Sequence, residues 1–135
     1  MKRKAMTVCF VLLSILILAG CNADSPVKSI SGAVKIEILV AETDETVILT
    51  EKEAVRHICD NLVSLKLRKT EYSEPTILVY TLRFYDAGGE QLEVIDIPAH
   101  SWIGWSGDRY FYSITGGELD RGYINEIVDQ YRTKT

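Results

Sequence analysis

The feature that most constrains this chain is an N-terminal stretch of twenty residues whose charge and hydropathy pattern differs from that of the rest. Lys2, Arg3 and Lys4 are positively charged and precede an apolar run, AMTVCFVLLSILILA, at positions 5–19. A helix that crosses a bilayer needs about 20 apolar residues, and this run is shorter. Positive charges, a short apolar run and small closing residues together predict a secretory signal peptide.

The stretch ends in Leu18-Ala19-Gly20-Cys21. These four residues resemble the processing site of bacterial lipoproteins. The resemblance implies that the Cys21 thiol carries diacylglycerol and that the chain is cut between Gly20 and Cys21. Each buried CH₂ contributes about 0.8 kcal/mol, so two or more acyl chains hold a protein stably at a membrane. We therefore expect a lipid anchor on the extracytoplasmic face of the cell membrane. An uncleaved N-terminal membrane anchor is the alternative.

The charge of the chain limits the classes of partner that it can bind. The chain has 15 basic and 19 acidic side chains, and without Lys2, Arg3 and Lys4 it has 12 basic ones, a net charge near −7. An acidic domain is a poor ligand for nucleic acid, which selects basic surfaces. The same charge argues against electrostatic docking on anionic lipid, which leaves the anchoring to the acyl group.

Cysteine use agrees with this division of the chain. Cys9 lies in the predicted signal and Cys21 takes the lipid, which leaves Cys59 alone. No intrachain disulfide can form after processing, so the domain must be held together by packing. We expect Cys59 to be a buried apolar side chain rather than a nucleophile.

The predicted domain organisation has three parts: the signal peptide at residues 1–20, a lipidated flexible tether at 21–32, and one domain at 33–135. Residues 22–32, NADSPVKSISG, have no hydrophobic period and are rich in residues typical of linkers. The remaining hundred or so residues are enough to bury a core without disulfide bonds.

Two helices are predicted. Thr50-Glu51-Lys52-Glu53 fits a capping box, in which the Thr50 hydroxyl and the Glu53 carboxylate satisfy the first amide groups. Asp120 can cap the second helix. The apolar side chains at helical spacing are Val55, Ile58, Cys59 and Leu62 in the first helix, which ends near Ser64, and Tyr123, Ile124, Ile127, Val128 and Tyr131 in the second.

Alternation of apolar and polar residues predicts the strands. In the first, at 33–40, Val34, Ile36 and Ile38 should share the buried face. Other strands are expected at 47–49, after Leu65, and at 76–86, 91–97, 101–105 and 109–115. Turns at 87–90 and 106–108 indicate two hairpins. The fold class is α+β, an antiparallel sheet of about four to six strands with two amphipathic helices packed on it.

The order of these elements resembles small Firmicutes lipoproteins built around a domain of unknown function. The matching motifs are the "T-x-K-E" of the first helix, a "Y-x-x-x-F-Y-D-x-G-G" hairpin, an aromatic second hairpin and a closing "Y-I-x-x-I" helix. They fall here at 50–53, 80–89, 110–112 and 123–127. The resemblance implies location and fold, and it brings no activity with it.

The second hairpin is the one candidate ligand site. It carries the aromatic side chains Trp102, Trp105, Tyr110 and Tyr112, with Phe111 on the other face of its strand. Aromatic side chains form stacking platforms for sugar rings or for the apolar side chains of a partner. The alternative is that they pack across the strands and feed the core.

No catalytic or metal site is predicted. His57 and His100 are the only histidines and do not have the spacing of a metal pair. The chain has neither a G-x-S-x-G elbow nor a phosphate-binding loop. We expect no enzyme activity, no cofactor and no metal.

The sequence therefore favours a membrane-anchored, non-enzymatic binding module of the cell envelope, with an envelope protein or a glycan as its partner. The alternative is an inhibitor or immunity-type lipoprotein, whose acidic surface would attract a basic secreted enzyme or toxin. An enzyme that uses an unrecognised cleft is the third hypothesis.

Overall fold

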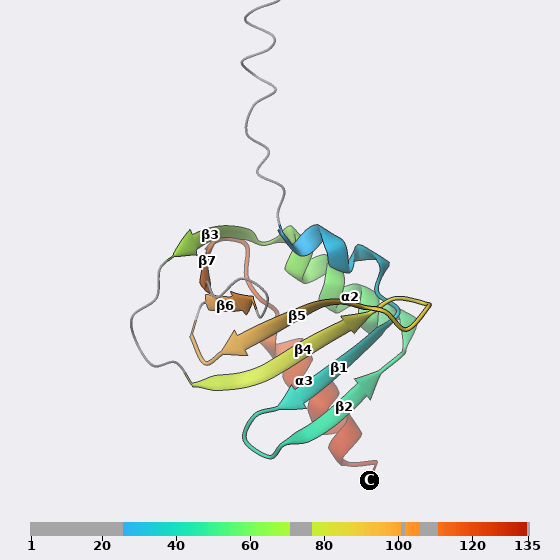
Figure 1. Cartoon of the computed structure of the whole chain (residues 1–135). Helices are drawn as coiled ribbons and strands as arrows, with labels where there is room; N and C mark the ends of the chain where they lie inside the picture. The colour runs from blue at the N-terminus through green and yellow to red at the C-terminus, as the bar shows by residue number, and fades with distance from the viewer. Residues whose placement is uncertain (1–25, 71–76, 101, 106–110, 135) are drawn as a thin grey trace, which may run out of the picture.

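The computed structural model describes residues 26–70, 77–100, 102–105 and 111–134, so the predicted signal peptide and Cys21 lie outside the described residues. The fold is α+β, with one seven-stranded antiparallel open sheet and two α-helices (Figure 1). The strands are β1 (Lys35–Val40), β2 (Glu45–Leu49), β3 (Lys66–Thr70), β4 (Leu78–Tyr85), β5 (Gln91–Pro98), β6 (Trp102–Trp105) and β7 (Phe111–Gly116). The helices are the 3₁₀ helix η1 (Pro26–Gly32) and the α-helices α2 (Lys52–Ser64) and α3 (Arg121–Arg132).

The strands lie in the order β2-β1-β4-β5-β6-β7-β3. The predicted count of four to six strands was too low, because the short strands β2 and β3 both pair, one at each edge of the sheet. Strands β4 to β7 form a meander, whereas β1 and β2 form a separate hairpin that joins at β4. Helix α2 connects the two edge strands, so the chain crosses the whole sheet between β2 and β3.

The core lies between one face of the sheet and the helices. Register places Ile38 opposite Val47 on one side and Leu82 on the other. Leu82 in turn lies opposite Ile95, and all four side chains are buried. Both α-helices lie on this side of the sheet (Figure 1), and their apolar stripes are the predicted ones. The opposite face, which neither α-helix covers, is called the open face below.

Part of the segment predicted as a flexible tether is folded. Residues 26–32 form η1, which packs on α2 and on the central strands β4 and β5. Val27 and Ile30 are 1% and 0% exposed and belong to the core. The linker-like composition concealed these two apolar residues, which lie three apart and so share one side of a 3₁₀ turn. Among the described residues, packing therefore begins at Val27 rather than at Ala33.

Two other local predictions were wrong. Helix α2 has Glu51 as its N-cap, without a side-chain capping bond, so the capping box at Thr50 does not form. The first helical bond runs from the Val55 amide to the Glu51 carbonyl at 2.9 Å, one residue later than a Thr50 cap requires. Val34 is 49% exposed because β1 begins only at Lys35, so it does not join the buried face of that strand.

Helix α3 is fixed at both ends. The Asp120 carboxylate accepts a hydrogen bond from the Tyr123 amide at 3.0 Å, which confirms the predicted cap. Along the helix, the Tyr80 hydroxyl of β4 donates to Asn125 Oδ1 at 2.6 Å. At its end, Arg132 forms an ion pair with Glu45 of β2 at 2.9 Å. These contacts hold α3 across the strands of the β2 side of the sheet.

Candidate functional site

A row of side chains crosses the open face in register. Leu39 lies opposite Thr81, Thr81 opposite Asp96, Asp96 opposite Gly104, and Gly104 opposite Phe111. The Thr81 hydroxyl, in a residue only 8% exposed, donates to Asp96 Oδ1 at 2.7 Å. A Cβ at Gly104 would lie 3.2 Å from the Phe111 ring and 3.1 Å from the Asp96 Cβ. The absence of that carbon lets the Phe111 ring lie down against the sheet.

Apolar side chains surround this row. Ile48, opposite Glu37 on β1, is 53% exposed, and Leu78, the first residue of β4 and opposite Pro98, is 39% exposed. The partly exposed members on the strands are Leu39, Val94, Trp102 and Phe111. A sheet face that is rich in apolar groups and lacks a covering helix is typical of a protein-binding surface. The open face is therefore the candidate binding site.

The structure divides the predicted aromatic hairpin between the two faces. Trp102 lies opposite Ser113 and belongs to the open face. Tyr112 lies opposite Ile103, is 8% exposed and belongs to the core. Trp102 and Tyr112 are therefore not brought together, and Phe111 is the aromatic neighbour that shares the face of Trp102. Phe111 was not among the predicted site residues, although the alternation of side chains along the strand already placed it on the other face from Tyr112.

The other two members of the predicted platform are only partly visible. The backbone of Trp105 ends β6 and lies opposite Ile95, but its side chain lies outside the described structure, as does Tyr110. The ligand-binding role of the hairpin stays a prediction, carried among the described residues by Trp102 and Phe111.

One end of the open face is charged. The Lys35 ammonium lies 3.0 Å from a Glu37 carboxylate oxygen and 4.0 Å from the centre of the Tyr85 ring. The Tyr85 hydroxyl donates to the other Glu37 oxygen at 3.0 Å. These two hydrogen bonds, that of Lys35 first, lower the pKa of the Glu37 carboxyl. The group pairs its charges internally and marks the polar border of the apolar surface.

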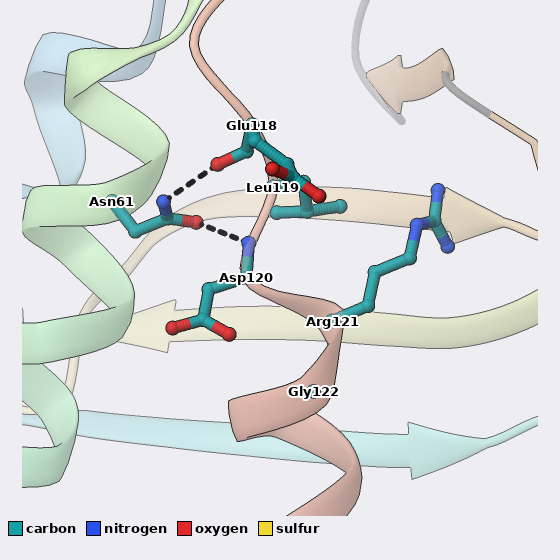
Figure 2. Close-up of a pocket in the computed structure, with 6 residues that line it drawn as sticks. All are labelled: Asn61, Glu118, Leu119, Asp120, Arg121 and Gly122. Carbon is teal, nitrogen blue, oxygen red and sulfur yellow. Dashed lines mark hydrogen bonds between the residues drawn. The ribbon is translucent and has the colours of Figure 1, made fainter.

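A second candidate is a polar hollow of about 440 Å³ where α2 meets the start of α3 (Figure 2). Asn61 of α2 bridges its wall: its amide donates to the Glu118 carbonyl at 2.9 Å, and its side-chain oxygen accepts from the Asp120 amide at 2.9 Å. Figure 2 shows both bonds joining the helix to the chain that leads into α3. Nothing in the sequence singled out Asn61, since its role depends on a neighbour 59 residues away.

His57 completes this junction. Its Nε2 lies 2.9 Å from Asp120 Oδ2, and its ring stacks on Tyr123 with 3.9 Å between centroids. An ionised carboxylate only accepts hydrogen bonds, so Nε2 carries the hydrogen and His57 donates. Such a pair could move a proton, but Asp120 also caps α3. The described contacts of Asp120 join the two helices, so we assign the hollow a structural role.

Arg121, the first residue of α3, holds the chain that follows β5. Its guanidinium donates to the carbonyl of Pro98 at 2.5 Å and to the carbonyl of His100. Burial lowers the pKa of this guanidinium, which nevertheless stays charged at neutral pH. The two histidines thus serve separate parts of the fold, His57 through its ring and His100 through its backbone.

A third hollow, of about 380 Å³, lies between η1 and α2, and buried Cys59 is among its lining residues. Burial raises the pKa of the Cys59 thiol to about 11, so the thiolate is scarce at neutral pH. This agrees with the prediction of an inert, buried cysteine.

Among the described residues, no three His, Cys, Asp or Glu side chains are grouped so that they could hold a metal ion. No described helix has both the length and the apolar character needed to cross a bilayer. Comparison with known proteins found no matching family model, no matching curated protein and no matching solved structure. The similarity to Firmicutes lipoproteins therefore stays a prediction.

Proposed function

We propose that this chain is a lipoprotein of the cell envelope, held on the extracytoplasmic face by diacylglycerol on Cys21, and that its domain binds a partner without catalysing a reaction. The observation that carries the proposal is Leu18-Ala19-Gly20-Cys21 at the end of a charged and then apolar N-terminal segment. The buried, unpaired Cys59 fits an exported domain that is stabilised by packing alone.

The open face supports the binding role. It presents Trp102 and Phe111 together with Ile48 and Leu78, and the charged border at Lys35 and Glu37 limits it at one end. Aromatic side chains on a flat apolar surface act as anchors in protein and sugar recognition. We propose an envelope protein or a glycan as the partner.

The anchor is tested by replacing the lipidated residue. The wild-type chain should sediment with membranes and lose the mass of residues 1–20, whereas Cys21→Ala should keep its full length and leave the lipoprotein pathway. A Cys9→Ala variant is the matched control, because that thiol lies in the apolar run and should not matter. If the wild-type chain in the membrane fraction still has the mass of residues 1–20, a peptide helix holds the chain and the lipid anchor is wrong.

The inhibitor or immunity-type function is supported by a separate feature. The turn between β1 and β2 and the start of β2 carry Glu42, Asp44 and Glu45, all exposed, at one edge of the sheet. An acidic edge would attract a basic secreted protein with a rate that falls as salt rises. Salt-sensitive association with such a protein, weakened by Glu42→Gln and Asp44→Asn, would favour this function over the first.

A further inference from the structure

The two edges of the sheet carry opposite charge. Edge strand β3 exposes Lys66, Arg68 and Lys69 and contains no acidic residue. At the opposite edge, β2 and the turn before it expose the acidic group Glu42, Asp44 and Glu45. The net charge near −7 is therefore not spread evenly, and β3 is a local basic surface on an acidic domain.

Strand β3 lies at the same end of the domain as η1, where the described chain begins. Because η1 packs on the domain, only five residue steps separate Cys21 from Pro26, which limits the distance between them to roughly 18 Å. Helix η1 packs on α2, and α2 leads directly into β3 through Leu65. Figure 1 shows η1 and β3 at the same end of the molecule, with the β1–β2 turn and the C-terminus at the other end.

We propose that the β3 edge faces the membrane and binds anionic lipid headgroups, so that the lipoprotein stands with its acidic β1–β2 edge pointing away from the bilayer. The inference depends on the lipid anchor proposed above. The chemistry recognised is the negative phosphate surface of a bilayer, which each nearby Lys or Arg favours by roughly fivefold in binding.

Distance explains why the overall negative charge does not cancel this attraction. Six strand spacings of about 4.8 Å put the β2 edge up to roughly 29 Å from β3. The Debye length is about 8 Å at physiological ionic strength, so charges at the far edge are screened from a surface that touches β3. Net charge alone, the basis of the prediction against lipid docking, does not capture this separation.

Charged side chains on an edge strand can have another purpose, since they prevent pairing with the edge of a second molecule. That role requires charge of either sign, whereas lipid binding requires positive charge. Reversing the sign at β3 therefore separates the two explanations. Arg68 and Lys69 suit this test because both are exposed, while the Lys66 side chain covers Gly116 and is left in place.

The experiment uses the full chain, processed and lipidated in a bacterial host, inserted into vesicles of phosphatidylcholine alone or mixed in equal parts with phosphatidylglycerol. A fluorophore is attached at Thr115→Cys, beside Lys66, or at Gln130→Cys, near the far end of α3. Buried Cys59 should not react. Quenching by a headgroup quencher should be stronger at position 115 than at position 130, and this difference should be larger with phosphatidylglycerol than with phosphatidylcholine alone.

Raising the salt from about 0.15 M to about 1 M shortens the Debye length to about 3 Å and should remove the increase that phosphatidylglycerol causes. On vesicles with phosphatidylglycerol, Arg68→Gln/Lys69→Gln should reduce the ratio of molecules with β3 toward the bilayer to molecules with β3 away from it by up to roughly 30-fold. Arg68→Glu/Lys69→Glu should abolish the effect of phosphatidylglycerol on this ratio. Arg56→Glu/Lys134→Glu makes the same change in net charge away from β3 and should leave the effect of phosphatidylglycerol intact.

The outcomes are distinct. Vesicles that float without the wild-type protein would overturn the lipid anchor and this inference with it. Protein that floats, but whose quenching does not respond to lipid charge, salt or the β3 variants, would overturn this inference alone. Equal effects of the β3 variants and of their charge-matched control would also overturn it, because net charge rather than β3 would then be responsible.

Discussion

The imidazole of His57 lies 2.9 Å from the carboxylate of Asp120 and thereby joins α2 to the first turn of α3 across 63 residues of sequence. The same carboxylate accepts from the Tyr123 amide, so it serves as helix cap and as tertiary contact at once. Asp120→Ala removes both interactions, and loss of a cap alone costs about 1 kcal/mol. We expect the free energy of unfolding, measured with urea, to fall by about 1–2 kcal/mol.

Asp60→Ala is the control, because it removes another aspartate whose ion pair with Arg56 is 3.4 Å long and well exposed. Pairs of this kind contribute about 0–1 kcal/mol, so the change should be small. Equal losses in the two variants would show that the contact between His57 and Asp120 does not stabilise the junction.

The same pair predicts a pH dependence. The hydrogen bond from His57, and then that from the Tyr123 amide, hold the pKa of the Asp120 carboxyl below its ordinary value of 3.8. The unfolded chain therefore takes up a proton before the folded chain does as pH falls. The stabilisation is complete above pH 3.8 and is lost as pH decreases through the lower, folded pKa. Urea titrations below pH 4 should show a shallower loss for Asp120→Asn than for the wild type; parallel curves would contradict this assignment.

Helix η1 yields a test of where the domain begins. Ile30 is 0% exposed and Ile77 is 73% exposed, so the same substitution by alanine compares a core position with a surface one. Ile30→Ala should lower the free energy of unfolding by about 2–5 kcal/mol, whereas Ile77→Ala should change it by less than about 0.5 kcal/mol. A negligible effect of Ile30→Ala would mean that residues 26–32 behave as the tether that their composition predicted.

Cys59 gives a direct measure of core opening. Because burial raises the pKa of its thiol to about 11, alkylation of the folded chain at pH 8 should be far slower than that of a free cysteine. Urea should restore the ordinary rate. The measurement is made on the lipidated chain, in which Cys59 is the only free thiol of the processed sequence. Rapid alkylation without urea would show that the hollow between η1 and α2 opens to reagents.

Local signals predicted most of this fold. The helices at Val55–Leu62 and Tyr123–Tyr131 repeat apolar residues every three or four positions, and their buried faces are the ones observed. The hairpin after Tyr85 was predicted from Gly88 and Gly89, and Gly89 has a φ of 82°, which glycine adopts without strain. Each of these features depends on residues close together in the chain.

Features that depend on distant partners were not predicted. Burial of Val27 and Ile30 requires α2 and the central strands, none of which is visible in an eleven-residue segment of mixed composition. The bridge made by Asn61 requires the chain before α3 to arrive beside α2. The opposite charge of the two sheet edges requires the strand order, because β2 and β3 are close in sequence and farthest apart in the sheet.

The aromatic hairpin supplies the test of binding by the open face. Tyr112 and Trp102 lie on neighbouring strands but on opposite faces, since Tyr112 is opposite Ile103 and Trp102 is opposite Ser113. Tyr112→Ala removes a ring from the core and should lower the free energy of unfolding by about 3–5 kcal/mol. Trp102→Ala should cost about 1 kcal/mol, because the residue is partly exposed and an average substitution costs that much.

Binding of the partner should depend on Trp102, whereas the stability of the domain should depend mainly on Tyr112. Immobilised lipidated chain, exposed to envelope proteins and to a panel of envelope glycans, should lose its specific partner with Trp102→Ala while the variant remains folded. Phe111→Ala should weaken capture as well, because the Phe111 ring lies on the same face above Gly104. Leu78→Ala, at the start of β4, tests how far the contact surface extends. If Trp102→Ala destabilises the domain as strongly as Tyr112→Ala does, and capture by the folded fraction is unchanged, Trp102 serves packing and the partner binds elsewhere.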